Sequence, residues 1–328
     1  MREISLENVV DTEGKVPRWT FCIFGATRSG KTTFAASFPR VAFLSDVTES
    51  GYESLRGISD EFLFEPGVQP IVLGIDKMND MVLAREMLAP HIRSGMVTTV
   101  AIDSATFYAD LYLNYLFELQ GANVNNLKAY GALGVHLRDL RVKWHQMGCN
   151  VIWLCLPQDP DEDRPNGLPM IPGKEAGKFG ASCDYLLFSR HDRFKQGNEI
   201  TDRFEMHSKP YGKYIAGCRR SDGVPELPNP LVNSTYTQMI QAMGYDVDAY
   251  RASLPAYQRP KLIVPQVAPP PVSAANATPQ QVAKPAVKPH IPTAARPVPA
   301  SNGVRPAVQP TVTRRPAVPA GRSGNNNS

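Results

Sequence analysis

Residues 21–33, which read FCIFGATRSGKTT, are the most informative stretch of this sequence. The first four are apolar, as in a buried strand, and the residues that follow the stretch continue with the pattern of a helix. Between strand and helix stands the spacing Gly25-x-x-x-x-Gly30-Lys31-Thr32. Glycines let the backbone curl until successive N–H groups point at one centre. This order predicts a loop that binds an anion at the N-terminus of a helix.

The same spacing is that of a P-loop, which binds a nucleoside triphosphate with magnesium. The cofactors expected from it are ATP and Mg²⁺. Lys31 would place its charge at the β and γ phosphates, and Thr32 would give its hydroxyl to the metal. Arg28 lies inside the loop, where exposure to solvent is the alternative to a ligand contact. The residues predicted to bind the nucleotide are Gly25, Ala26, Thr27, Arg28, Ser29, Gly30, Lys31, Thr32 and Thr33.

A second magnesium anchor is expected about seventy residues further on. Residues 97–104, VTTVAIDS, are an apolar strand that ends in Asp103. A buried strand of this form delivers one carboxylate to the edge of the sheet where the metal lies, as a Walker B segment does. The metal ligands predicted from the protein are therefore Thr32 and Asp103. The alternative is that Asp103 or Ser104 only caps the next helix.

Hydrolysis also needs a group that orients or deprotonates water. The second strand pattern, residues 41–44, is followed by SDVTESG, which contains Asp46 and Glu49. The carboxyl ends of parallel strands face the ligand crevice, so both acids are candidates. Glu49 is preferred as the catalytic acid and Asp46 comes second. A solvated turn that contains two acids is the alternative.

Segments rich in β-branched residues alternate with helix-like segments through the first 250 residues. Strands are predicted at 19–24, 41–44, 71–75, 97–102 and 150–156, and helices at 31–37, 77–91, 105–119 and 127–147. Later strand patterns at 185–189, 202–206 and 214–218 indicate an antiparallel extension. The alternation predicts an α/β domain with a mostly parallel sheet flanked by helices.

Charge and composition divide the chain into two parts. Residues 1–250 carry 25 Lys/Arg and 31 Asp/Glu, whereas residues 251–328 carry ten Lys/Arg, no acid and sixteen of the 30 prolines. The predicted domains are therefore a P-loop domain at 1–250 and a disordered, basic Pro/Ala-rich tail at 251–328, because the tail cannot bury enough apolar surface to fold. No segment reaches eighteen apolar residues, so a cytoplasmic protein without a membrane span is expected.

The order of these motifs resembles the RecA-like branch of P-loop ATPases. It is most similar to compact phage-encoded ATPases of the AAA type and to single-strand annealing and recombination ATPases. The resemblance covers about residues 18–228 and includes the stretch 168–180, LPMIPGKEAGKFG, followed by Asp184. Many relatives end the strand at Leu156 in Thr-Ala-His, whereas this chain has Leu-Pro-Gln. Since RecA ends that strand in a glutamine that senses the γ-phosphate, the resemblance implies this role for Gln158.

The resemblance also implies partners. It suggests a homo-oligomeric ATPase that acts on single-stranded DNA in recombination, annealing or replication, in which Arg219 or Arg220 reaches the nucleotide of a neighbouring subunit. A basic pair on a sheet edge is the alternative for the two arginines. DNA contacts could lie in the loop 159–178, which opens with acids, or in the basic tail, which suits polyanions. The tail could instead be a linker or dock a protein.

Two other functional classes remain open from the sequence. A nucleotide or small-molecule kinase uses the same P-loop, but it needs an acceptor pocket and an arginine-rich lid, and the long loop here is acidic and rich in Gly and Pro. An ATP-switched loader or packaging subunit would bind a replication or recombination protein through the tail. The sequence alone does not separate the loader from the recombinase.

Overall fold

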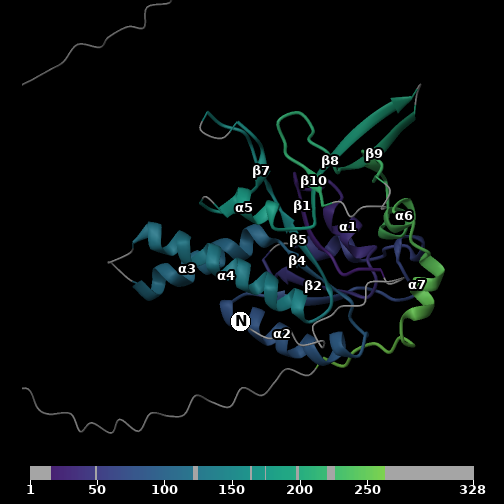
Figure 1. The fold of residues 1–328 in the computed structure, drawn as a ribbon, viewed down its shortest axis with the longest axis horizontal. Helices are drawn as coiled ribbons and strands as arrows, with labels where there is room; N and C mark the ends of the chain where they lie inside the picture. The colour runs from purple at the N-terminus through teal and green to yellow at the C-terminus, as the bar shows by residue number, and fades with distance from the viewer. Residues whose placement is uncertain are drawn as a thin grey trace, which may run out of the picture. The chain divides into compact units, whose positions relative to one another are not determined.

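The central feature of the computed structural model is one sheet with the strand order β11–β9–β8–β1–β5–β4–β2–β3, in which β10 pairs with β8 (Figure 1). The structure describes residues 16–48, 50–120, 125–162, 165–173, 175–196, 199–219 and 226–262. Within these residues the strands of the sheet are β1 Thr20–Gly25, β2 Val41–Asp46, β3 Ile71–Ile75, β4 Thr99–Asp103, β5 Asn150–Cys155, β8 Tyr185–Gln196, β9 Glu199–His207, β10 Gly217–Cys218 and β11 Leu231–Val232. Two further strands, β6 Pro157–Gln158 and β7 Leu168–Pro169, form a separate small hairpin.

The middle of the sheet is parallel, as the sequence predicts. β1 pairs in parallel with β5 on one side and with β8 on the other, and β4 pairs in parallel with β5 and β2. All six residues of β1 are buried. Since β5 lies between β1 and β4, the strand that leads into the P-loop and the strand that ends in Asp103 are not neighbours. Their carboxyl ends nevertheless meet at one edge of the sheet.

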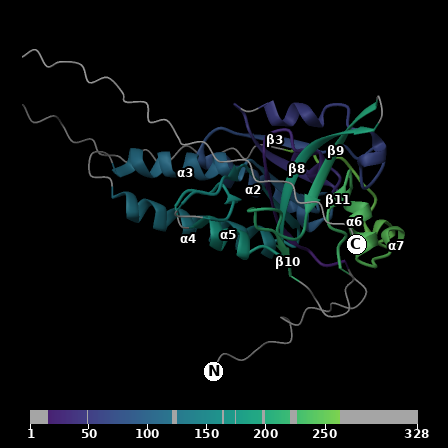
Figure 2. The same cartoon turned by 90° about the horizontal axis from the view of Figure 1, so that it is seen from above.

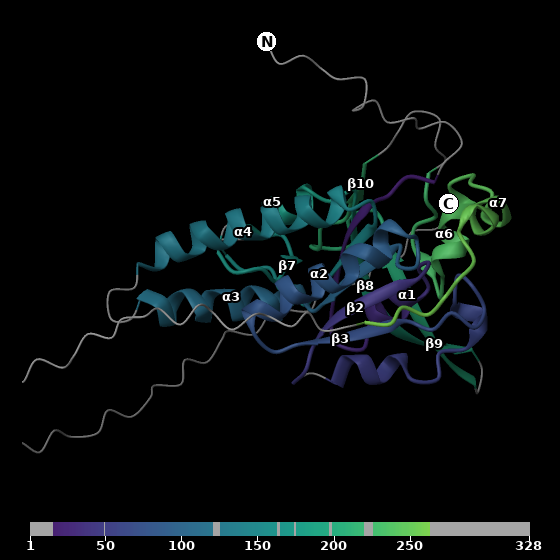
Figure 3. The same ribbon diagram turned by 90° about the horizontal axis from the view of Figure 1, so that it is seen from below.

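Helices cover both faces of the sheet, which confirms the predicted fold class (Figure 3). One layer contains α2 Met78–Arg93, α3 Ala105–Gln120, α4 Asn126–Gln146 and α5 Glu175–Ala181, and the other contains α1 Lys31–Ala36, α6 Tyr236–Ala242 and α7 Val247–Ser253. Alternate side chains of β1 divide between them. Cys22 and Phe24 belong to the first core, and Phe21 and Ile23 to the second. Helices α3 and α4 extend together away from the sheet (Figure 2).

The strands after residue 184 form the expected antiparallel extension, except at the start of β8. β8 joins β1 in parallel from Tyr185 to Ser189 and then continues as a long antiparallel ribbon with β9. The sequence pattern located the buried start of this strand and missed its continuation, because residues 190–195 are mostly polar and mostly exposed. The third expected segment is a strand only at Gly217–Cys218.

The packed chain continues past residue 250. Arg40 donates a hydrogen bond to the backbone oxygen of Pro255 at 2.6 Å, and its guanidinium lies 5.3 Å from the centre of the Tyr257 ring. Leu262 packs against the core. Residues 251–262 of the predicted tail therefore lie on the domain, while residues 263–328 are outside the described part of the chain. In the described part, no helix combines the length and apolarity needed to cross a membrane.

Candidate functional site

The loop between β1 and α1 is shaped by close backbone packing. A Cβ on Gly25 would lie 2.0 Å from the backbone oxygen of Ser189 in β8, so no larger residue fits there. Gly30 has φ of +86°, which favours glycine, and a Cβ on it would lie 2.9 Å from the ring of Phe204 in β9. The Ser189 hydroxyl donates to the backbone oxygen of Ser29 at 2.6 Å. β8 and β9 therefore fix the loop from the side.

Lys31, the first residue of α1, folds back onto this loop. Its Nζ donates to the backbone oxygens of Gly25 at 2.8 Å and Ala26 at 2.7 Å. Both acceptors are neutral carbonyls, whereas hydrogen bonds from an ammonium to an anionic oxygen are about twice as strong as neutral ones. The cation thus lies at the mouth of the loop with partners that an anionic ligand could replace.

Thr32 and Asp103 contact each other across the edge of the sheet. The Thr32 hydroxyl donates to Asp103 Oδ2 at 2.9 Å, although β5 lies between β1, which leads into the P-loop, and β4, which ends in Asp103. Partial burial raises the pKa of the Asp103 carboxyl, and the Thr32 hydrogen bond and the Lys31 charge oppose this shift. The neighbouring Ser104 caps α3, since its hydroxyl accepts from the backbone N–H of Phe107 at 3.2 Å. The alternative of helix capping therefore fits Ser104, and Asp103 faces Thr32.

The donor set at this edge suits magnesium. Thr32 and Asp103 supply hard oxygen ligands, and Mg²⁺ keeps several of its waters and takes few protein ligands. Clusters of three or more His, Cys, Asp or Glu side chains, which other metals prefer, do not occur among the described residues. The residues present fit a magnesium ion bound together with a phosphate ligand.

The two candidate acids after β2 differ, because the structure describes Asp46 and does not describe Glu49. Asp46 is buried, with 2% of its surface exposed, and its carboxylate accepts from the backbone N–H and the hydroxyl of Thr48 at 2.8–2.9 Å. This arrangement holds a turn and favours a structural role for Asp46. Glu49 lies outside the described residues, so its predicted role stays a prediction. The segment after it approaches the site, since a Cβ on Gly51 would lie 3.6 Å from Asp103 Oδ2.

Gln158 lies just beyond the carboxyl end of β5, in the β6–β7 hairpin. Its backbone pairs with Leu168. The end of β5 is held next to this hairpin, because the backbone N–H of Leu156 donates to the hydroxyl of Thr106 at 3.1 Å. Thr106 is three residues after Asp103 in the chain. The hairpin thus starts from the edge that carries Asp103, and the γ-phosphate role of Gln158 remains a prediction.

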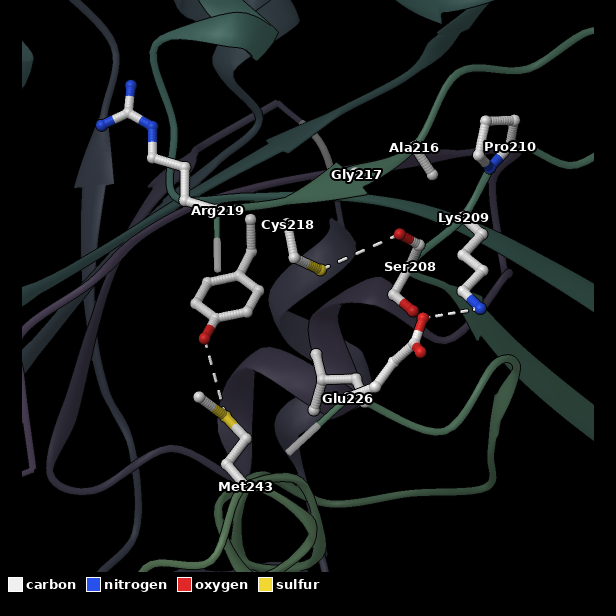
Figure 4. A pocket seen from close by; sticks show the side chains of 11 residues that line it. Ser208, Lys209, Pro210, Ala216, Gly217, Cys218, Arg219, Glu226 and Met243 are labelled. Carbon is white, nitrogen blue, oxygen red and sulfur yellow. Dashed lines mark hydrogen bonds and ion pairs between the residues drawn. The ribbon is translucent and has the colours of Figure 1, made fainter. Parts of the chain in front are cut away.

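Arg219 lies at the opposite end of the sheet. Its backbone N–H donates to the backbone oxygen of Asp184 at 2.8 Å, and its guanidinium contacts the Asp184 carboxylate at 3.4 Å. Asp184 also accepts from the backbone N–H of Thr20, at the start of β1. The side chain of Arg219 points away from the other residues around a cavity of about 240 Å³ (Figure 4). Contact with a neighbour's nucleotide stays a prediction, and Arg220 lies outside the described residues.

A further cavity, of about 260 Å³, opens directly beside the P-loop. The residues around it include Gly30, Thr33, Phe62, Asp202, Phe204 and Asn233. Sequence reasoning found the first two as loop residues and missed the others. Phe204 and Asp202 belong to a strand pattern that carries no chemical motif. Asn233 is distinguished only in the structure, where its φ is +45°.

A P-loop at a helix N-terminus, with a carboxylate at the end of a nearby strand, defines a P-loop nucleotide-binding protein. Residues 18–214 match the model of a family described as the AAA domain. The match covers more than half of the chain, so the protein belongs to the AAA domain family and carries its P-loop ATPase domain. A comparison with curated proteins found no significant match.

Proposed function

We propose that this protein binds ATP and magnesium at residues 25–33 with Asp103, hydrolyses the nucleotide, and uses the cycle on single-stranded DNA in recombination, annealing or replication. The observation that carries the nucleotide part is the 2.9 Å contact between Thr32 and Asp103, with Lys31 beside it. A cation, a hydroxyl and a carboxylate converge there on the N-terminus of α1, and the AAA domain match supports ATP as the nucleotide.

The chain's own residues supply positioning and electrostatics in this proposal. Backbone N–H groups of the loop and the Lys31 ammonium would hold the phosphates in place of the present Lys31 partners, the carbonyls of Gly25 and Ala26. Thr32 and Asp103 would hold magnesium, which when bound neutralises charge on the phosphate oxygens. Glu49 would orient the attacking water, and Gln158 would sense the γ-phosphate. These groups act mainly by holding reactants in line, as is general for phosphoryl transfer.

The DNA part rests on different support. The motif order resembles recombination and annealing ATPases, and the chain after residue 250 carries ten positive charges and no acid. Such a segment binds polyanions through counterion release without reading sequence. We propose a homo-oligomer in which a neighbour completes the site, with Arg219 or Arg220 as the group supplied in trans. The loop 159–178 is the second candidate for DNA contact.

The test is the rate of phosphate release from ATP and Mg²⁺, measured alone and with single-stranded DNA, double-stranded DNA, or small acceptors such as nucleosides and nucleoside monophosphates. We expect hydrolysis that single-stranded DNA stimulates most and no phosphorylated acceptor. Phosphate transfer to an acceptor would replace the proposal with a kinase. A DNA-independent rate that a replication or recombination protein stimulates would replace it with a loader. The Lys31→Ala variant in each assay excludes a contaminating ATPase.

A further inference from the structure

We propose that the cavity between the P-loop and β9 binds the base and ribose of the nucleotide, with Phe204 and Phe62 as its apolar walls. The inference rests on the proposed function in one respect, because it takes the P-loop as the phosphate site. It assigns a second, chemically different subsite to residues that lie far from the P-loop in the sequence.

The position of the cavity is the first support. Gly30 and Thr33 belong to the P-loop segment and also line the cavity, so the two spaces are continuous. A nucleotide with its phosphates on the loop has its nucleoside part within a few ångströms of these residues. The cavity volume of about 260 Å³ suits one base and a sugar and is small for a larger substrate.

The chemistry of the walls is the second support. Phe204 presents an aromatic ring beside Gly30, and the ring stacks on His191 with centroids 4.6 Å apart and planes 15° apart. His191 is in turn held by Asp202, whose Oδ1 lies 2.8 Å from the imidazole Nε2. His191 and Asp202 therefore hold the Phe204 ring in position without a ligand. Aromatic rings in such positions stack on nucleobases of any sequence.

The rim of the cavity supplies polar groups. The Asn233 side-chain oxygen accepts from the backbone N–H of Phe204 at 2.8 Å, which leaves the NH₂ of this amide as the group for a ligand. Asp202 adds a carboxylate on the same side. A base edge or the two ribose hydroxyls offer the matching acceptors and donors. Few polar groups around an apolar wall are the usual composition of a small-molecule site.

A purely structural role explains Phe204 only in part. The contact with Gly30 accounts for the position of Phe204, but it gives no reason for Phe62, which lines the same cavity and is 40% exposed. The variant Phe62→Ala removes little packing, so the folded state should be retained. Phe194 provides the matched control: it is 54% exposed on the same ribbon and pairs with Thr201, on the face opposite to Phe204.

The experiment compares two ligands by calorimetry in the presence of Mg²⁺: ATP, which has a nucleoside, and inorganic tripolyphosphate, which has none. We expect Phe62→Ala and Phe204→Ala to weaken ATP binding by about tenfold each, the size expected for loss of one stacking contact. Tripolyphosphate binding should change by less than about twofold, within the effect of a surface substitution. Phe194→Ala should change neither affinity.

The outcomes separate the two proposals. Unchanged ATP affinity in both variants would overturn the base subsite and leave the P-loop proposal intact. Equal weakening of both ligands would also overturn the subsite, since Phe204 would then act only through the shape of the loop. Failure of the unmodified protein to bind either ligand would refute the phosphate site itself, and the subsite with it.

Discussion

The two ends of β1 are held in different ways. At the amino end, the backbone N–H of Thr20 donates to the Asp184 carboxylate at 2.8 Å, and the backbone N–H of Asp184 donates to the oxygen of Thr20 at 2.8 Å. At the carboxyl end, the Lys31 ammonium rests on two neutral carbonyls, and Asp103 is held with a raised pKa against a single hydroxyl.

The difference separates structure from function. The amino end satisfies its charged group with reciprocal bonds, which are the kind that stabilise a fold. The carboxyl end gathers a cation, a hydroxyl and a partly buried carboxyl beside the P-loop, an arrangement that suits a ligand with anionic oxygens and a metal ion. Substitutions at the carboxyl end should therefore affect ligand binding, and those at the amino end should affect folding.

The largest effect is expected for Lys31→Ala. Removing the charge at the mouth of the loop should reduce hydrolysis by at least about a hundredfold, because the phosphates lose their fixed cation. Tm should stay within about 2 °C, since the bonds from Lys31 to the carbonyls of Gly25 and Ala26 are exposed or partly buried. Phosphate release and thermal unfolding are measured together, with Lys128→Ala on α4 as the control. Turnover near that of the unmodified protein would remove Lys31 from the site.

The next effect concerns the loop after β2. Glu49→Gln should slow hydrolysis by about a hundredfold, in line with loss of a general base, while ATP binding persists. Asp46→Ala should instead lower Tm, because the variant loses the oxygen that accepts the bonds from the backbone N–H and the hydroxyl of Thr48. Single-turnover kinetics distinguish the two. An unaffected rate for Glu49→Gln would move the catalytic role to Asp46, and unaffected rates for both would exclude this loop from the chemistry.

The amino end provides the opposite expectation. Asp184→Ala leaves the backbone N–H of Thr20 without its partner, so unfolding should cost about 2 kcal/mol less, and Tm should fall by about 4–8 °C. Turnover per folded molecule should stay within about twofold, because Asp184 is at the far end of β1 from Gly25. Thermal unfolding and active-site titration with ATP measure these quantities. Loss of activity without loss of stability would mean that this end takes part in the chemistry.

The smallest effect is expected for removal of the tail. Because residues 255–262 pack on the domain through Pro255 and Tyr257, the deletion should begin at residue 263. The shortened protein should keep its fold and nucleotide binding. If the tail contacts DNA, each lost phosphate contact reduces the log–log salt slope by roughly 0.7 on single strands. A labelled oligonucleotide titrated over a salt series gives this slope. An unchanged slope and affinity would exclude the tail as a DNA contact.

Local sequence predicts the part of the candidate site that lies in continuous segments. Residues 25–33 form one continuous motif, and Asp103 ends an apolar strand, so spacing alone locates both. Phe204 and Asn233 were not predictable, because they come to line a cavity beside the P-loop only through the pairing of β8 with β1, of β9 with β8 and of β11 with β9. The register of a long polar ribbon has no apolar pattern to mark it. For the same reason the polar residues of β8 were missed. Residues 251–262 were assigned to the tail because their composition resembles that of the chain after them.

The most direct test of the central claim is thermal unfolding of Asp103→Asn with and without Mg²⁺ and ATP. Burial raises the pKa of Asp103, so the ionised carboxyl destabilises the folded state as pH rises through and above its ordinary titration range, and below that range the penalty is absent. Asparagine carries no charge and still accepts from Thr32. We therefore expect the variant without ligand to melt higher than the unmodified protein at pH 7, and the difference to disappear as the pH falls below the ordinary titration range of a carboxyl. Mg²⁺ with ATP should raise Tm of the unmodified protein and leave the variant nearly unchanged. A variant that melts lower without ligand and keeps the full shift with Mg²⁺ and ATP would contradict the account.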